Sequence, residues 1–231
     1  QVGDDIDGDS EFHGVLSSVS LSSDGLAVAI GAVGHDGFSG HTRIYKLSTS
    51  GQWIKVGADI DGDAKGDCSG WSVSLSNDGL TVAIGAPSIN SYVDQSGYTR
   101  IYKLNSTSGQ WNQVGDDIDG DSEFHGVLSS VSLSSDGLAV AIGAVGHDGF
   151  SGHTRIYKLS TSGQWIKVGA DIDGDAKGDC SGWSVSLSND GLTVAIGAPS
   201  INSYVDQSGY TRIYKLNSTS GQWNQVGDDI D

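Results

Sequence analysis

A perfect internal repeat dominates the sequence and limits how the chain can fold. Residues 1–112 recur without a change as residues 113–224, and residues 225–231 repeat the first seven residues once more. Each unit divides again, because the sequence that starts at Val2 resembles the sequence that starts at Val56, 54 residues later. The chain therefore contains four modules of about 56 residues, in the order A, B, A, B. A period of this length predicts an array of similar units that pack on their neighbours, in place of one conventional core.

The hydrophobic pattern of module B predicts four β-strands. Residues 70–76 alternate large apolar residues with serine, which is the period of a half-buried strand. Asp78 and Gly79 then predict a hairpin turn, and the almost continuously apolar residues 80–86 predict a strand that is covered on both faces. Two further strands are expected at residues 97–104 and 110–115, with a turn at residues 105–109 between them.

Four such modules without helical periodicity predict an all-β fold, a β-propeller of four four-stranded antiparallel blades. Stacking similar sheets round an axis protects their faces and leaves only short edges. An open β-solenoid is the alternative. We expect one domain over residues 1–231, with blades at approximately residues 1–57, 58–115, 116–169 and 170–231.

The sequence leaves open how the ring closes. Four blades can close alone, and two chains can also form an eight-bladed ring, because identical modules encode no blade count. We favour the monomer. The overlap at residues 225–231 is interpreted either as a spare copy of the ring seam or as generous boundaries of a synthetic or excerpted array, for which the perfect repeat also argues.

Charge and residue usage exclude several kinds of partner. The net charge of −17 argues against nucleic acid, and equally against an anionic membrane. No apolar run approaches the roughly 20 residues of a membrane-spanning helix.

Cys68 and Cys180 occupy the same position in two repeats, too far apart across a ring to form a disulfide, and are expected to be free thiols. Glycosylation sequons at Asn105 and Asn217 favour an extracellular location.

A longer pattern spans the whole of module B. It consists of Gly70-Trp71-Ser72-Val73, Asp78-Gly79-Leu80-Thr81-Val82-Ala83-Ile84-Gly85-Ala86-Pro87, Gly97-Tyr98-Thr99-Arg100-Ile101-Tyr102 and Gln110-Trp111. This pattern resembles the FG-GAP repeat, the blade unit of the integrin α-subunit head and of many bacterial and marine extracellular proteins. Module A keeps most of this pattern, with Ser17 and Val33 in place of Trp71 and Pro87.

The FG-GAP resemblance covers essentially the whole chain and implies an extracellular β-propeller. Two departures limit what it implies further. Integrin-type rings have seven blades, whereas this chain has four modules. Members that bind calcium have an Asp-rich loop between the first two strands, where this chain has only Ser76-Asn77-Asp78-Gly79. That calcium site is therefore not carried over.

An acidic motif opens each module. Carboxylates at every second position of an extended segment project to one side, and calcium binds six to eight oxygen ligands. The candidate calcium ligands are Asp59, Asp61, Asp63 and Asp67, their repeats Asp171, Asp173, Asp175 and Asp179, and in modules A Asp5, Asp7, Asp9, Asp117, Asp119 and Asp121. We favour an architectural alternative, in which these aspartates pair with the arginines of the third strands, Arg43, Arg100, Arg155 and Arg212.

Aromatic residues and histidines offer two further candidate sites. Trp71 and Trp183 are candidate sugar-binding platforms, although packing between blades is the favoured role of every tryptophan in the repeat. Four histidines, His35, His41, His147 and His153, lie in the variable loops of modules A, near Asp36 and Asp148. They could form a transition-metal or pH-sensitive site. We favour histidines exposed on loops.

The sequence contains no nucleophile elbow, zinc-binding helix or phosphate-binding loop, so we expect no enzyme. The first hypothesis is a non-catalytic scaffold or an interaction and adhesion module, with an unknown protein or glycan partner. The alternatives are a multivalent lectin, a calcium-binding extracellular repeat protein, and an engineered array without an assigned function. Any specific function is expected where modules A and B differ, at residues 33–40, at residues 87–97 and at the position shared by His13 and Asp67.

Overall fold

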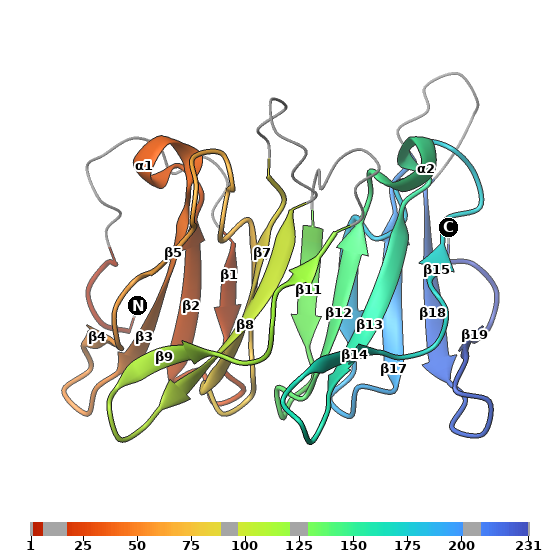
Figure 1. The fold of residues 1–231 in the computed structure, drawn as a ribbon. Helices are drawn as coiled ribbons and strands as arrows, with labels where there is room; N and C mark the ends of the chain where they lie inside the picture. The colour runs from red at the N-terminus through yellow and green to blue at the C-terminus, as the bar shows by residue number, and fades with distance from the viewer. Residues whose placement is uncertain (1, 7–17, 89–96, 121–128, 201–208, 231) are drawn as a thin grey trace.

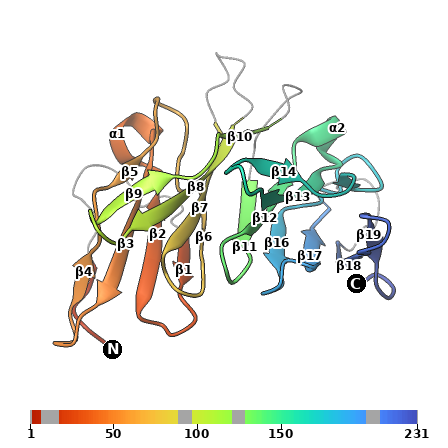
Figure 2. The ribbon, with the colours of Figure 1, turned by 60° about the horizontal axis from the view of Figure 1, so that its bottom comes forward.

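The computed structural model describes residues 2–6, 18–88, 97–120, 129–200 and 209–230. Their strands form four antiparallel sheets that follow one another along the chain, which confirms the predicted all-β fold and its four blades. Figure 1 shows the sheets side by side in a row, with the first and the last at opposite ends. Figure 2 shows the same row from a second direction. We name the sheets blades 1 to 4 in chain order.

Each blade has four main strands, and blades 1 to 3 have a short fifth one. Blade 1 contains β1 (Val19–Leu21), β2 (Ala27–Ala32), β3 (His41–Leu47), β4 (Trp53–Lys55) and β5 (Ile60–Asp61). Blade 2 contains β6 (Ser72–Leu75), β7 (Thr81–Ala86), β8 (Tyr98–Asn105), β9 (Gln110–Gln113) and β10 (Ile118–Asp119). Blade 3 contains β11 (Ser129–Leu133), β12 (Ala139–Ala144), β13 (His153–Leu159), β14 (Trp165–Lys167) and β15 (Ile172–Asp173). Blade 4 contains β16 (Ser184–Leu187), β17 (Thr193–Ala198), β18 (Tyr210–Leu216) and β19 (Trp223–Gln225).

Two single helical turns, α1 (His35–Phe38) and α2 (His147–Phe150), connect the second and third strands of blades 1 and 3. Both turns contain left-handed residues, as at Asp36, where φ is 39°. Figure 1 shows α1 and α2 on the same side of the row, along its upper edge in this view. The variable loops of the two modules A therefore meet solvent on one side of the molecule.

The Asp-Gly dipeptides form the predicted hairpin turns between the first and second strands. In blade 1, Asp24 Oδ1 accepts hydrogen bonds from Ser22 Oγ at 2.6 Å and from the N–H of Leu26 at 2.9 Å. Gly25 follows with φ +70°, a conformation that residues with a side chain rarely adopt. The same turn recurs in the other three blades, with φ between +66° and +69° at its glycine.

The outer strand of a blade is broken into two pieces. In blade 1, β4 and β5 both pair with β3, and β5 places Ile60 opposite Thr42 and Asp61 opposite His41. The acidic motif of module B therefore begins on the outer edge of blade 1. This acidic motif joins the outer strand of blade 1 to the inner strand of blade 2.

Serine side chains join each inner strand to the next one. The inner strands β1, β6, β11 and β16 contact one another in this order. The N–H of Val73 donates to Ser18 Oγ at 3.0 Å, and the same bond links blade 2 to blade 3 and blade 3 to blade 4. The serines that alternate with apolar residues in these strands therefore hold neighbouring blades in register.

Hydrophobic cores lie at the three junctions between consecutive blades. At each junction, residues of the second and third strands of one blade pack against the first and second strands of the next. The core between blades 1 and 2 contains Ala27, Ala29, Ile44, Ile60, Val73, Leu75, Val82 and Ile84. This division explains how a chain with only 36% hydrophobic residues can fold, because no single large core is needed.

The second strands differ in burial although their sequences are nearly alike. All six residues of β7 in blade 2 are buried, as predicted for a strand covered on both faces. In β2 of blade 1 the first, third and fifth residues are buried, whereas in β17 of blade 4 the second, fourth and sixth are buried. Successive residues of a strand point to opposite faces. Blade 1 and blade 4 therefore each have one uncovered face, and these are opposite faces of the sheet.

The inner strand of blade 1 is exposed as a result. Val19 and Leu21 are 67% and 61% exposed, whereas the identical repeat residues Val131 and Leu133 are 6% and 7% exposed. The surrounding sequence is the same, so the difference comes from the preceding blade, which blade 3 has and blade 1 lacks. The described blades thus form an open row within one chain.

Cys68 and Cys180 are buried and form no disulfide, as expected from their spacing. In the described part of the chain, no helix is long and apolar enough to span a membrane.

Candidate functional site

Each third-strand arginine forms an ion pair with the acidic motif that follows it. Guanidinium nitrogens lie 2.7–2.9 Å from the first aspartate of the motif in all four blades. The pairs are Arg43–Asp59, Arg100–Asp117, Arg155–Asp171 and Arg212–Asp229. This is the architectural arrangement that the sequence favoured, and Asp229 joins the set of acidic residues named from the sequence.

The pKa values of these aspartates reflect the pairing. The hydrogen bond from Arg43, with that from Lys55, lowers the pKa of Asp59 to about 2, against a smaller opposing effect of burial. Burial raises the pKa of Asp171, but the hydrogen bonds from Arg155 and Lys167 outweigh it and lower the pKa to about 2. Both carboxylates are therefore ionised at neutral pH and held by two cations.

In modules B the arginine also connects two acidic motifs. Arg100 pairs with Asp117 on its own blade and with Asp63, which lies between blades 1 and 2. Its guanidinium carbon lies 4.1 Å from the centre of the Tyr98 ring, a cation–π contact. Arg212, Asp175, Asp229 and Tyr210 repeat this arrangement in blade 4.

The fourth aspartate of a module B motif is buried inside a loop. Asp67 Oδ2 accepts hydrogen bonds from the N–H groups of Asp63 and Ala64, at 3.1 and 3.0 Å, and from the hydroxyl of Tyr98 at 3.1 Å. In blade 4, burial and the neighbouring Asp179 raise the pKa of Tyr210 to about 12. The tyrosine therefore stays protonated and donates its hydrogen bond at neutral pH.

The carboxylates of one acidic motif do not converge on a common point in the described structure. Asp59 binds Arg43 and Lys55, Asp63 binds Arg100, and Asp67 binds its own loop and Tyr98. Among the described residues, groups of three metal-binding side chains form only where histidines join an aspartate, and no group consists of aspartates alone. Asp5, Asp117 and Asp119 lie in the described ranges, whereas Asp7, Asp9 and Asp121 lie outside them.

The fourth-strand tryptophans pack between blades. Trp111 of blade 2 donates from Nε1 to the carbonyl oxygen of Val56 on blade 1 at 2.8 Å, and Trp165 and Trp223 make the same bond to the blade before them. In blade 1, Trp53 makes it to Val2, at 3.0 Å. The N-terminal residues therefore occupy the place that a preceding blade fills elsewhere.

The two candidate sugar platforms differ in exposure. Trp183 is 46% exposed, whereas its repeat Trp71 is partly buried. Trp71 precedes the inner strand of blade 2, which blade 3 follows, and Trp183 precedes the inner strand of blade 4, which no described blade follows. The exposure of Trp183 therefore follows from the open end of the row.

The surroundings of the module A histidines were predicted least well from the sequence. His41 and His153 begin third strands and are only 4% and 3% exposed, so the expectation of exposed loop histidines is wrong for these two. Ligand atoms of His35, His41 and Asp61 lie within 4.8 Å of one another, and His147, His153 and Asp173 form the same group. The aspartate of the group is Asp61, and not Asp36, which is nearer in the sequence, because β5 pairs with β3.

Burial, with the charges of Arg43 and His35, lowers the pKa of His41. Its imidazole is therefore neutral at pH 7. The difference between modules A and B at this position, His41 against Tyr98, is visible in the sequence. The strand pairing that brings Asp61 to it is not.

Searches with the sequence match no protein-family profile and no curated protein. The FG-GAP resemblance thus stays a prediction. The fold does have relatives among solved structures. TolB from Acinetobacter baumannii is 18% identical, with 90% of this chain and 42% of that chain covered and a TM-score of 0.50.

Two further structures are similar. The β-propeller domain of the trilobed protease from Pyrococcus furiosus, described as having an open velcro topology, is 12% identical over 93% of this chain and 58% of its own, with a TM-score of 0.51. KlAtg21 in complex with the coiled coil of AgAtg16 is 15% identical over 94% and 59%, with a TM-score of 0.56. The chain thus spans between 42% and 59% of the length of these three structures. It has the β-propeller fold.

Proposed function

We propose that the chain is a non-catalytic propeller scaffold that associates end to end, two copies closing a ring of eight blades. One observation carries this proposal: the same residues are buried in the middle of the row and exposed at its ends. Val19 and Leu21 are more than 60% exposed, whereas Val131 and Leu133 are less than 8% exposed. A second copy whose blade 4 lies against blade 1 would bury them as blade 2 buries Val131 and Leu133.

The polar groups at the two ends are complementary as well. Ser184 and Ser186 of blade 4 are exposed and occupy the positions from which Ser130 and Ser132 bind the backbone of blade 4. Facing a second copy, they would accept hydrogen bonds from the inner strand of its blade 1. Trp183, Ser184, Gly197 and Ile230 belong to an open groove on this face. The contact would continue an interface that the chain already forms three times.

Contacts of this kind join two different surfaces of the chain. They form a closed ring only when the rotation from one subunit to the next is a whole fraction of a full turn. Four blades per chain permit closure with two copies. The row superposes on parts of longer propeller chains, which fits an arc of a larger ring better than a ring of four. Two chains would replace the monomer that the sequence favoured. The ring would display four module A loops at one end, a multivalent arrangement.

The two chain ends carry the same sequence and compete for one position. Residues 1–7 and 225–231 are identical, and Val2 accepts the hydrogen bond from Trp53 that Val226 of a second copy would accept in the ring. A Cβ atom on Gly3 would lie 2.8 Å from Trp53 Cδ1, whereas one on Gly227 would have nothing within 4 Å. Gly227 therefore has no tryptophan against it in the single chain, whereas Gly3 already lies against Trp53.

Removing both end segments is expected to weaken the dimer, whereas removing either one is not. Without residues 1–7, the segment 225–231 of the second copy can reach Trp53. Without residues 225–231, the N-terminal segment of the second copy can pair with Thr211, as Ile230 does now. Loss of both removes a tryptophan-centred contact and a strand pairing, and we expect the dissociation constant to rise by about 100-fold.

Sedimentation equilibrium of the three shortened chains, beside the full chain, measures this effect. Circular dichroism of each protein controls for folding. If deletion of either segment alone abolished association, or if deletion of both had no effect, the proposed contact between the two copies would be wrong.

A further inference from the structure

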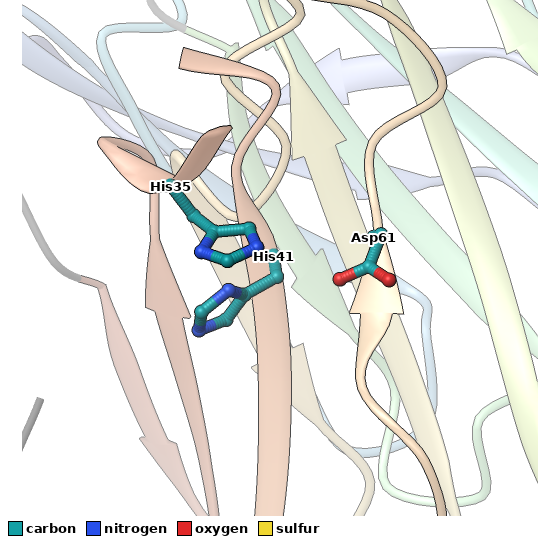
Figure 3. A group of neighbouring side chains, drawn as sticks. All are labelled: His35, His41 and Asp61. Atoms are coloured by element: carbon teal, nitrogen blue, oxygen red, sulfur yellow. The ribbon is translucent and has the colours of Figure 1, made fainter. Parts of the chain in front are cut away.

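Two histidine–aspartate groups lie on blades 1 and 3. His35, His41 and Asp61 each bring a ligand atom within 4.8 Å of the other two. Figure 3 shows the two imidazole rings next to each other, with Asp61 on the adjacent strand. His147, His153 and Asp173 repeat the group in blade 3.

Regular structure holds the three side chains of the first group. His35 belongs to the kinked turn α1, and its ring centre lies 4.5 Å from that of His41, with the ring planes at 63°. His41 begins β3, and the pairing of β5 with β3 places Asp61 directly opposite. Residues directly opposite each other in antiparallel strands have their Cβ atoms close together. The group is thus preformed by the blade.

One ring nitrogen in this group lacks a partner. His41 is 96% buried, and its Nδ1 atom has no hydrogen-bond partner in the structure. Buried polar atoms without a partner are rare in folded proteins, because they lose their bonds to water without replacement. His41 belongs to the same group as the half-buried His35 and the exposed Asp61. An ion entering from the side of Asp61 would meet all three donors.

We propose that each group binds one zinc ion, through one nitrogen of each histidine and one oxygen of the aspartate, with water completing the tetrahedron. Two imidazoles and a carboxylate are ligands that zinc prefers, and three protein ligands leave one position for water. Calcium is a poor fit, since it takes six to eight oxygen ligands. The acidic motif of module B thus contributes Asp61 to a site that differs from the all-aspartate one expected from the sequence.

Blades 2 and 4 lack the site because a tyrosine replaces the buried histidine. Tyr98 lies opposite Asp119, as His41 lies opposite Asp61, but its hydroxyl donates to Asp67. Tyr210 makes the equivalent bond to Asp179. The proposal therefore predicts two zinc ions per chain, and not four.

Titration of the metal-free chain with zinc chloride, followed by isothermal calorimetry, tests the stoichiometry. Cobalt(II), added alone, reports the geometry through the visible absorbance of tetrahedral coordination. The double variants His35→Ala/His147→Ala and Asp61→Asn/Asp173→Asn each remove one ligand per site. The matched control Asp36→Asn/Asp148→Asn makes the same carboxylate-to-amide change on exposed residues of α1 and α2, outside the group.

We expect two ions per chain and an affinity lower by more than about 10-fold in both ligand variants, since even substitutions behind a ligand cost this much. The control variant should bind as the unchanged chain does, and a large excess of calcium should not displace cobalt. Unchanged zinc binding in the His35→Ala/His147→Ala variant would overturn the proposal, as would a stoichiometry other than two. Asp61 and Asp173 are exposed, so their variant tests the site even if the histidine variant misfolds.

Discussion

Replacing Val131 and Leu133 by glutamate is expected to unfold the chain, whereas the same pair of substitutions at Val19 and Leu21 is expected to leave a folded monomer. The first pair is 6% and 7% exposed at the junction of blades 2 and 3. Burying two carboxylates there and losing the apolar packing would cost at least about 4 kcal/mol, close to the whole stability of many domains. The second pair is 67% and 61% exposed, so the single chain loses little.

The sequence repeat makes each of these two double variants a matched control for the other. Both double variants make the same chemical change in the same local sequence, and only the neighbouring blade differs. Urea unfolding gives the stability of each protein, and light scattering gives its mass. Equal loss of stability in the two variants would mean that blade 1 is covered within the single chain. A Val19→Glu/Leu21→Glu protein that still dimerises would place the interface elsewhere.

Gly143→Ala is expected to destabilise the chain by about 3 kcal/mol, whereas Gly197→Ala is expected to weaken only the association of two chains. A Cβ atom on Gly143 of blade 3 would overlap the carbonyl oxygen of Gly182 and lie 2.8 Å from its carbonyl carbon. Gly182 cannot move aside easily, because its N–H binds the carbonyl oxygen of Gly197 and its φ is +87°. Blades 3 and 4 would have to separate.

Gly197 is the same position one blade later, where no described blade follows. Its first neighbour would be Ser184 Oγ at 2.5 Å, the end of an exposed side chain that can rotate away. Alanine also suits a strand better than glycine, so the fold should keep its stability. In the ring, however, a second copy would lie against this face. Thermal unfolding and sedimentation equilibrium distinguish the two effects, and equal destabilisation by both substitutions would contradict the account.

The four main strands of a blade and their order could be predicted because module B displays each of them as a separate hydrophobic pattern. The Asp78-Gly79 turn, the apolar strand at residues 81–86 and the Arg100–Asp117 pairing all depend on local sequence or on one contact per module. The open row could not be predicted. Closure depends on the small rotation between neighbouring blades, and similar interfaces fit rings of several sizes.

The aspartate of the histidine group was missed for a similar reason. Asp36 is next to His35 in the sequence, whereas Asp61 reaches His41 only through the pairing of β5 with β3. The sequence assigned Asp61 to the start of the next blade. A broken outer strand, which continues one blade into the next module, has no clear hydrophobic signature over two residues.

The mass of the unmodified chain in solution tests the end-to-end association most directly. Light scattering coupled to size exclusion, over a range of concentrations, should give twice the chain mass of 23.9 kDa, with dissociation only on dilution. A mass of 23.9 kDa at every concentration, or a series of ever larger assemblies, would contradict a ring of two chains.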